Sequence, residues 1–258
     1  NHELGELTTL HARYWCDYAC DPRGPLSWRF KGGMGSGALG DIGAHIIDQG
    51  EYLCGPIASV SGGSLSIQIP KRPLPLGAVV GHNAAPVSSE MGEVENEDTA
   101  TFTARFQSGL AATFSVSRTA FGEPNGLGFD VYGTAGRASF DFHRPAEYTI
   151  DDAQPEARTR GLRRVIVGPQ MPYFHNGYPM EASGVGIGNQ EQFNYQARAF
   201  LDQIAGVENP LPPNATFADG LRSMEIIEAV VKSSRDGAAV AIAPSGSATP
   251  SAAPVVPA

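Results

Sequence analysis

Residues 35–48 read GSGALGDIGAHIID, and the way this stretch is interpreted decides how the rest of the chain is understood. Its first six residues match the G-x-G-x-x-G pattern of a dinucleotide-binding turn, in which glycines bring the backbone close to a pyrophosphate. Its second half carries Asp41, His45 and Asp48, which are residue types that transfer protons. The stretch therefore predicts a nucleotide site, a catalytic helix, or a helix that serves only the fold.

The surroundings of these glycines disfavour a nucleotide-binding turn. Such a turn follows a buried apolar strand, but residues 28–34 read WRFKGGM and are not an apolar run. Glu51, the acid nearest to the position of a ribose-binding carboxylate, falls inside the predicted helix. The glycines also run into that helix instead of only opening it. We interpret Gly40 and Gly43 as leaving room for another group to approach the helix start.

Helical spacing, for a helix that ends near residue 53, separates this stretch into two faces. The polar face comprises Asp41, His45, Asp48 and Tyr52, and the apolar face comprises Leu39, Ile42, Ile46 and Leu53. Side chains four residues apart lie side by side, so Asp41 and His45 are expected to meet. A carboxylate next to an imidazole makes it more basic and holds it in place, as a general base requires. The alternatives are a solvated helix face or a metal site, for which no third ligand is visible nearby.

Composition limits the possible partners. Of the 258 residues, 41% are apolar, and no apolar run approaches the roughly 18 residues that a membrane span requires. The net charge of −9 argues against a nucleic-acid partner, because phosphate binding depends on a basic surface. The first residues are polar and unlike a signal peptide. The odd set of Cys16, Cys20 and Cys54 favours free thiols. We expect a soluble, cytoplasmic protein with no membrane partner.

Short runs of alternating or β-branched residues, separated by turn residues, predict a sheet. Strands are expected at 7–18, 57–69, 99–106, 110–119, 127–132 and 138–142, with weaker ones at 147–150 and 163–167. Tight turns between the later strands predict an antiparallel meander instead of βαβ units. Residues 70–96 are rich in proline and lack apolar periodicity, so they are expected to form a long surface excursion.

After residue 188 the hydrophobic period becomes helical. Helices are expected at 192–204 and 216–229, with Thr216 as the N-cap of the second and Asp219 completing a capping box. Residues 243–258 are dominated by Ala, Pro, Ser and Val and are expected to be a disordered tail. The fold class is therefore predicted as α+β: a mostly antiparallel open sheet with helices on one face, formed by residues 1–242.

Several of these motifs together resemble the C-terminal domain of the glucose–fructose oxidoreductase/inositol dehydrogenase (Gfo/Idh/MocA) family. The shared features are Trp28-Arg29, the run Gly-x-Gly-Ala-Leu-Gly-Asp-Ile-Gly-x-His-x-x-Asp at 35–48 and Leu-x-Gly-Pro-Ile-x-x-Val at 53–60. The resemblance continues with the VYGTAG hairpin at 131–136, the YQARAF helix at 195–200 and the ADGLR helix at 218–222. It covers residues 5–242.

This resemblance implies an NAD(P)-dependent oxidoreductase that acts on a sugar, glycoside or cyclitol hydroxyl, with hydride transfer at C4 of the nicotinamide. By the same resemblance, His45 is the acid/base, and Asp41 is its partner or a hydrogen-bonding group for substrate. Trp28 and Arg29 match the family pair that lies against the cofactor. The helical face of the sheet would then pack against the cofactor domain, and the other face would form a homo-oligomer.

The sequence departs from the family pattern on the cofactor side. Family members begin with a Rossmann domain that carries a glycine fingerprint and a Glu-Lys-Pro motif with a catalytic lysine. None of Lys31, Lys71 and Lys232 lies in such a motif. We therefore expect the Rossmann domain to be supplied in cis or in trans, and we expect no turnover by this chain alone. The alternative is a non-catalytic oligomerisation or scaffold subunit of the same fold.

Four further residues are candidate substrate contacts. The aromatic-rich segment 172–178 contains His175 and Tyr178, which suit the apolar face and the hydroxyls of a sugar ring. Arg118 and Asn125 lie at the edge of a predicted hairpin that is expected to border the cleft.

Overall fold

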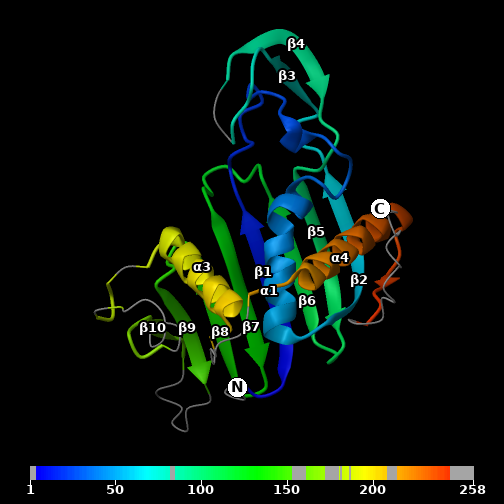
Figure 1. Ribbon diagram of the computed structural model, residues 1–258. Coiled ribbons are helices and arrows are strands. Elements are labelled where there is room, and N and C mark those ends of the chain that lie inside the picture. Colours follow the sequence, from blue (N-terminus) through cyan, green and yellow to red (C-terminus); the bar gives the residue numbers. More distant parts are fainter. Residues whose placement is uncertain are drawn as a thin grey trace, which may run out of the picture.

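The computed structural model describes residues 4–81, 85–152, 161–171, 180, 182–185, 187–207 and 214–244. Most of these residues belong to a nine-stranded open sheet with the strand order β10-β9-β8-β7-β1-β6-β5-β2-β11 (Figure 1). The strands are β1 (Leu7–Trp15), β2 (Ile57–Ser66), β5 (Thr99–Phe106), β6 (Ala111–Ser117), β7 (Gly126–Gly133), β8 (Gly136–Asp141), β9 (Glu147–Asp152), β10 (Arg163–Ile166) and β11 (Val240–Ala241). The sheet is mostly antiparallel, as predicted.

The expected simple meander was wrong at one place. Strand β1 lies between β6 and β7, parallel to β6 and antiparallel to β7. Trp15, the last residue of β1, pairs with Ser117 on one side and with Gly126 on the other. Local turn residues show that two strands follow one another, but they do not show whether a distant strand fits between them.

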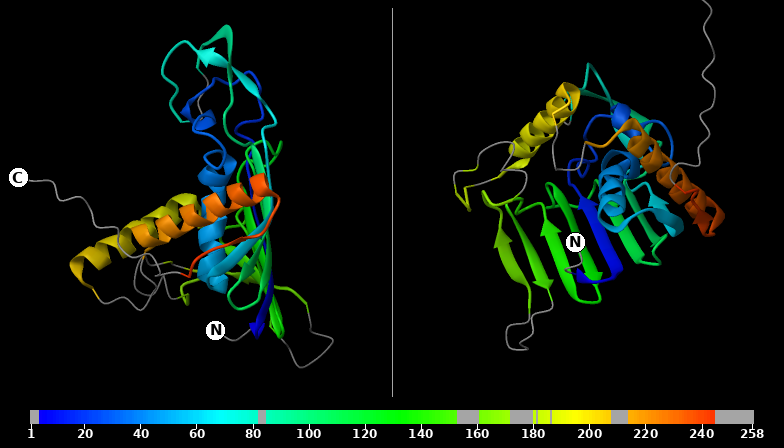
Figure 2. Two further views of the ribbon diagram at one scale, coloured as in Figure 1. Left: turned by 90° about the vertical axis from the view of Figure 1, so that its right-hand side faces the viewer. Right: turned by 60° about the horizontal axis from the view of Figure 1, so that its bottom comes forward.

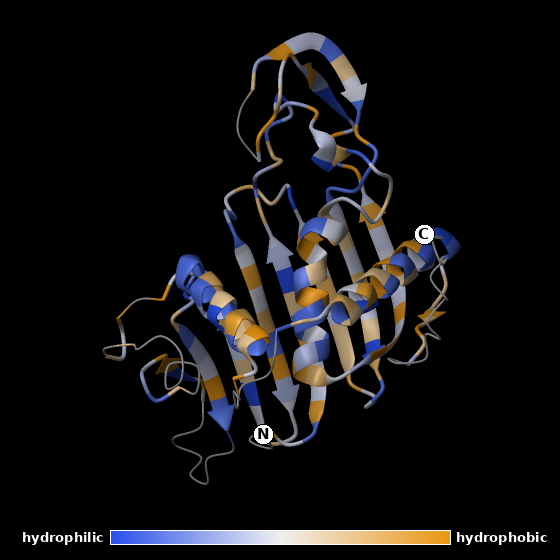
Figure 3. Cartoon of the chain, viewed as in Figure 1, coloured by the Kyte–Doolittle hydropathy of each residue, from blue (hydrophilic) through white to orange (hydrophobic). Residues whose placement is uncertain are grey.

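The two faces of the sheet differ because side chains alternate along each strand. One cross-strand row is apolar and comprises Val60, Ala104, Ala112, Leu10 and Val131. The next row is polar and comprises Ser61, Thr103, Thr113, His11 and Asp130. Figure 3 shows the alternation as apolar and polar bands along the strands. The apolar rows therefore define the face that needs a cover.

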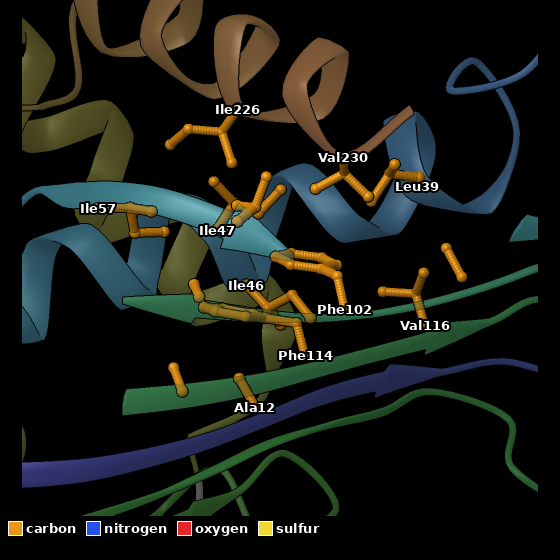
Figure 4. Close-up of a cluster of buried hydrophobic side chains, with 14 of the residues drawn as sticks. Ala12, Leu39, Ile46, Ile47, Ile57, Phe102, Phe114, Val116, Ile226 and Val230 are labelled. Carbon is orange, nitrogen blue, oxygen red and sulfur yellow. The ribbon is translucent and has the colours of Figure 1, made fainter. Parts of the chain in front are cut away.

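Helices cover the apolar face. A π-helical turn, η3 (Leu39–Gly43), leads into α1 (Ala44–Cys54), and α4 (Phe217–Asp236) packs beside it. Figure 2 shows α1, α4 and α3 (Asn189–Ala205) on the same side of the sheet. In Figure 4, Ile46 and Ile47 of α1 lie near the stacked rings of Phe102 and Phe114, whose centroids are 4.7 Å apart, and Ile226 and Val230 of α4 complete the same cluster. Each such buried side chain contributes about 1.5–3 kcal/mol, which fixes η3 and α1 on the sheet.

Residues 70–96, expected to form a long surface excursion, contain regular structure that was not expected. Strands β3 (Lys71–Pro75) and β4 (Val87–Glu93) form a separate two-stranded hairpin beyond one end of the main sheet (Figure 1). Prolines are tolerated there because a two-stranded ribbon leaves some N–H groups without a ladder partner. The hairpin covers a small second core with the loop that contains the 3₁₀ turn η2 (Trp28–Phe30).

The two expected C-terminal helices are confirmed as α3 and α4. Thr216 caps α4 as predicted, since its Oγ1 accepts a hydrogen bond from the Asp219 N–H, and Asp219 accepts one from the Thr216 N–H at 2.6 Å. Helix α4 continues beyond the expected end to Asp236, and the short β11 after it was not expected. The expected tail, 243–258, lies outside the described residues apart from positions 243 and 244. In the described ranges, no helix has both the length and the apolar character to cross a bilayer.

Candidate active site

The glycine-rich turn is folded around a carboxylate of its own chain. Glu97 is fully buried, and its two carboxylate oxygens accept hydrogen bonds from the N–H groups of Gly35 at 2.7 Å and Leu39 at 2.9 Å. Gly37 lies so close to Glu97 that an added Cβ would meet its carbonyl oxygen at 2.2 Å. The N–H groups at this helix start do hold an anion, but the anion is Glu97. This supports the interpretation of the glycines as a helix start.

The segment does not form the single α-helix that was expected. Residues Leu39–Gly43 form a π turn, and α1 begins at Ala44. A π turn bonds i to i+5, so residues four apart no longer lie side by side. In the described part of the chain, Asp41 does not pair with His45, and that expectation was wrong. Asp41 instead accepts hydrogen bonds from Tyr18 Oη at 2.7 Å and from Arg29 Nη1 at 3.0 and 3.1 Å.

Trp28 and Arg29 lie at the same place. The Arg29 guanidinium bonds Asp41 and stacks on the Trp28 ring, with 4.7 Å between the guanidinium carbon and the ring centroid. Trp28 is 69% exposed, so much of its indole surface is open to another molecule. An exposed aromatic ring beside a guanidinium suits a flat ring or a charged group. The structure thus brings three predicted site residues together: Trp28, Arg29 and Asp41.

His45 has a second set of neighbours. Its ring contacts the ring of Tyr14 edge-on, at a centroid distance of 5.8 Å. Asn125 is close by, because its Oδ1 accepts from Cys16 Sγ at 3.8 Å and its amide is near enough to the Tyr14 phenol to lower that group's pKa slightly. Burial raises the pKa of Asp48 on the same helix, Asp219 raises it further, and His45 partly offsets this. Asn125 therefore belongs to the surroundings of His45, through Tyr14.

Tyr14 and Tyr18 are site residues that the sequence analysis missed. Burial raises the pKa of both phenols, and Asp41 adds to the effect, so both groups stay protonated over the neutral range and can act as donors. Tyr14 lies near the end of β1 and Tyr18 follows that strand closely. Two tyrosines at the carboxyl end of one predicted strand were the available signal.

Arg118 does not border an open cleft, contrary to expectation. It is 1% exposed, and its Nε bonds buried Asp98 at 2.8 Å. Its Nη1 also donates to the carbonyl oxygen of Arg29 at 2.9 Å. Asn96 donates to the same carbonyl at 3.0 Å. The buried segment 96–98 and Arg118 therefore hold Arg29 in place from behind.

The remaining expectations concern two substrate contacts and a metal site. His175 and Tyr178 lie outside the described residues. Within the ranges that the structure describes, no three or more His, Cys, Asp or Glu side chains are grouped to hold a metal ion.

Together these features define an α+β domain in which titratable side chains gather at a π turn, at one end of an open, mostly antiparallel sheet. A family model described as the GFO/IDH/MocA C-terminal domain matches residues 1–139, and the chain belongs to this family.

Relatives and solved structures are consistent with this assignment. Levoglucosan dehydrogenase of Pseudarthrobacter phenanthrenivorans is 35% identical over 237 residues, which are 89% of this chain and 58% of the relative. A levoglucosan dehydrogenase solved with NADH and L-sorbose is 32% identical and has a TM-score of 0.81, over 94% of this chain and 60% of the other. An oxidoreductase domain protein from Kribbella flavida gives 33% identity and a TM-score of 0.81, over 94% and 61% of the two chains. The chain thus spans about three fifths of these relatives.

Proposed function

We propose that this chain is the substrate-binding and catalytic part of an NAD(P)-dependent oxidoreductase that acts on a hydroxyl of a sugar, glycoside or cyclitol. The observation that carries the proposal is the gathering of Trp28, Arg29, Asp41 and His45 around the π turn, at positions that match the family pattern. The similarity to a dehydrogenase solved with NADH and with L-sorbose or levoglucosan supports the choice of cofactor and substrate class.

The side chains suit the proton half of such a reaction. His45 takes the hydroxyl proton during oxidation and returns it during reduction. Asp41 is held by Tyr18 and Arg29, and its remaining lone pairs are free to accept a substrate hydroxyl. NAD(P), when bound, supplies the hydride acceptor or donor. Exposed Trp28, with Arg29 on its ring, offers that cofactor a stacking surface and a positive charge.

The side of the sheet that carries α1, α3 and α4, called the helical side below, is proposed to face the nucleotide-binding domain. That domain is supplied in cis or in trans. Helices α3 and α4 expose a set of large apolar side chains, each about half exposed or more: Phe193, Phe200, Leu201, Ile204, Phe217, Leu221 and Met224. Monomeric proteins rarely leave large contiguous apolar patches in water. The relatives are longer than this chain, which supports a further domain as the cover. The chain alone is then expected to bind NAD(P) weakly and not to turn over.

Turnover tests the proposal. In the full-length enzyme, with the nucleotide-binding domain present, His45→Ala should lower kcat by on the order of 10²-fold or more, because the proton acceptor is lost. The assay uses NAD or NADP with a panel of sugars and cyclitols. The control is His143→Ala, at an exposed turn after β8, which should leave the rate unchanged. A near-wild-type rate for His45→Ala would contradict the assignment.

A scaffold role is the second candidate, and the polar open face of the sheet favours it. Rows of hydroxyl side chains on that face are flat and exposed, which suits contact with a second copy. An assembly that persists while every cofactor and substrate pair fails would favour the scaffold. Oxidation of any one substrate that depends on His45 would exclude it.

A further inference from the structure

A hollow of about 240 Å³ opens beside the proposed active site. It lies between the loop that carries η2 and the β3–β4 hairpin, and its walls include Arg23, Ser27, Phe30 and Arg72. Tyr18 and Arg29, the two partners of Asp41, also line it. A molecule bound at Asp41 can therefore extend into this hollow.

Arg72 brings a positive charge to the wall that no carboxylate contacts directly. The residue is 1% exposed, and its two Nη groups donate to the carbonyl oxygens of Asp21 at 2.7 Å and Ala19 at 2.5 Å. Its guanidinium lies 4.1 Å from the centroid of the Phe30 ring. Among the described residues, no carboxylate oxygen lies within 4.0 Å of it. Burial lowers the pKa of Arg72, and Asp98 and Asp21 only partly offset this from a distance. A buried charge with no contacting counter-charge is costly, so an anion in the hollow would stabilise this arrangement.

The other arginines nearby already face carboxylates. Arg29 pairs with Asp41. Arg118, whose guanidinium also lies over the Phe30 ring, pairs with Asp98. Arg23 pairs with Asp21 at the rim, where its side chain is 87% exposed. Among the residues that line the hollow, Arg23 is offset by Asp21 and Arg29 by Asp41, so Arg72 leaves the lining with one positive charge in excess.

Two further donors are available to a bound group. The exposed pair of Arg23 with Asp21 is of a kind that contributes little, so Arg23 is free to turn toward a ligand. Ser27 is 9% exposed, and its hydroxyl has no hydrogen-bond partner among the described side chains and backbone. A hydroxyl can donate one hydrogen bond and accept others. The hollow thus offers donors and positive charge together.

We propose that this hollow is a subsite for an anionic group, a carboxylate or a phosphate, carried by the carbohydrate whose hydroxyl is oxidised. The inference rests on the proposed function, because Tyr18 and Arg29 belong to both the hollow and the site. It narrows the proposed substrate class from any sugar, glycoside or cyclitol to a sugar acid or a sugar phosphate.

Direct binding tests the subsite separately from oxidation. D-glucuronate, D-glucose 6-phosphate and D-glucose are titrated calorimetrically into the full chain without nucleotide. One of the two anionic ligands should bind about 10-fold tighter than D-glucose, because hydrogen bonds between charged groups are roughly twice as strong as neutral ones. Comparison of the two anions shows whether the group is a carboxylate or a phosphate. Equal affinities for all three ligands would overturn the subsite.

Variants locate the effect. Arg72→Met should abolish the preference for the anion, and Arg72→Lys should keep it, because lysine retains the charge. Arg23 lies at the exposed rim, so Arg23→Gln cannot disturb the core. This substitution should lower the affinity for the anionic ligand by about 3-fold and leave the affinity for D-glucose unchanged. Arg105→Gln, at an exposed position of β5, is the control. An unchanged preference in Arg23→Gln overturns the proposal even if Arg72→Met fails to fold.

The two proposals fail in different ways. A chain that prefers the anion but never oxidises a carbohydrate in the full-length enzyme contradicts the proposed function. A chain that oxidises neutral sugars in a His45-dependent way, with equal affinities for the three ligands, contradicts only the subsite.

Discussion

Asp41 shows what a single residue can and cannot reveal. Its type and its place in the pattern mark it as a candidate for hydrogen bonding to a substrate hydroxyl. Its partners, Tyr18 and Arg29, come from loops 23 and 12 residues away in the chain. Helical spacing had predicted His45 as the partner of Asp41, which was wrong. The carboxylate is therefore oriented from outside its own helix and not by His45.

The cysteines give a prediction at the residue scale. Burial raises the pKa of Cys16 and of Cys54 to about 11, compared with about 8.5 for an exposed thiol. The thiolate is the reactive form, so at pH 8 both should react slowly with DTNB (5,5′-dithiobis(2-nitrobenzoate)), and partly exposed Cys20 should react first.

The pH dependence of stability follows with a definite sign. Below about pH 8.5 the thiols are protonated in both the folded and the unfolded state. Between that pH and about 11 only the unfolded thiols ionise, so the free energy of unfolding falls as the pH rises. Reaction of all three thiols at one rate in the native protein at pH 8 would contradict this view.

At the scale of the element, the π turn and its buried carboxylate form one unit. Glu97 satisfies two N–H groups at the start of η3, and Gly37 permits the close approach that this requires. The turn in turn sets where Asp41 lies relative to α1. Glycines that imitate a nucleotide fingerprint thus serve a contact within the chain.

Two glycine substitutions test this unit. Gly37→Ala should lower the free energy of unfolding by about 1–3 kcal/mol, because the new Cβ meets backbone that cannot move aside. Gly220→Ala is the matched control in α4, where an added Cβ meets nothing within 4 Å. It should raise stability by about 0.5–1 kcal/mol, since alanine favours a helix. Urea unfolding measures both, and a loss of the same size in the two variants would count against the explanation.

At the scale of the whole molecule, the sheet separates two surfaces of different composition. The helical side carries the proposed site and exposed apolar side chains, and the open side carries rows of hydroxyls. We propose that a second copy covers the open side. The two proposed contacts then do not compete for the same surface.

One substitution on each side tests this division. Thr113→Arg, near the middle of the open face, should convert a dimer into a monomer, because both copies then bring a bulky charge to a flat contact. Gln203→Arg on α3 adds the same charge to the helical side and should leave the mass unchanged. Light scattering after size exclusion measures the mass. A Thr113→Arg protein that stays as large as the wild type would exclude this interface.

The sequence by itself determined much of this protein. Alternation of period two located most strands, helical period located α3 and α4, and Thr216 with Asp219 marked a helix start, because these signals depend on neighbours within a few residues. The same local signals disfavoured a nucleotide turn and singled out Asp41 and His45 as candidates. Trp28 and Arg29 became candidates only through the resemblance to the family.

Only the tertiary structure decided the rest. Strand β1 lies between β6 and β7, and Arg118 is buried against Asp98. Glu97 accepts hydrogen bonds from the glycine-rich turn, and Arg72 lines the hollow. Each of these depends on contacts between residues far apart in the chain. Local propensity and spacing carry no information about such contacts, because they arise only when the packed core brings distant segments together.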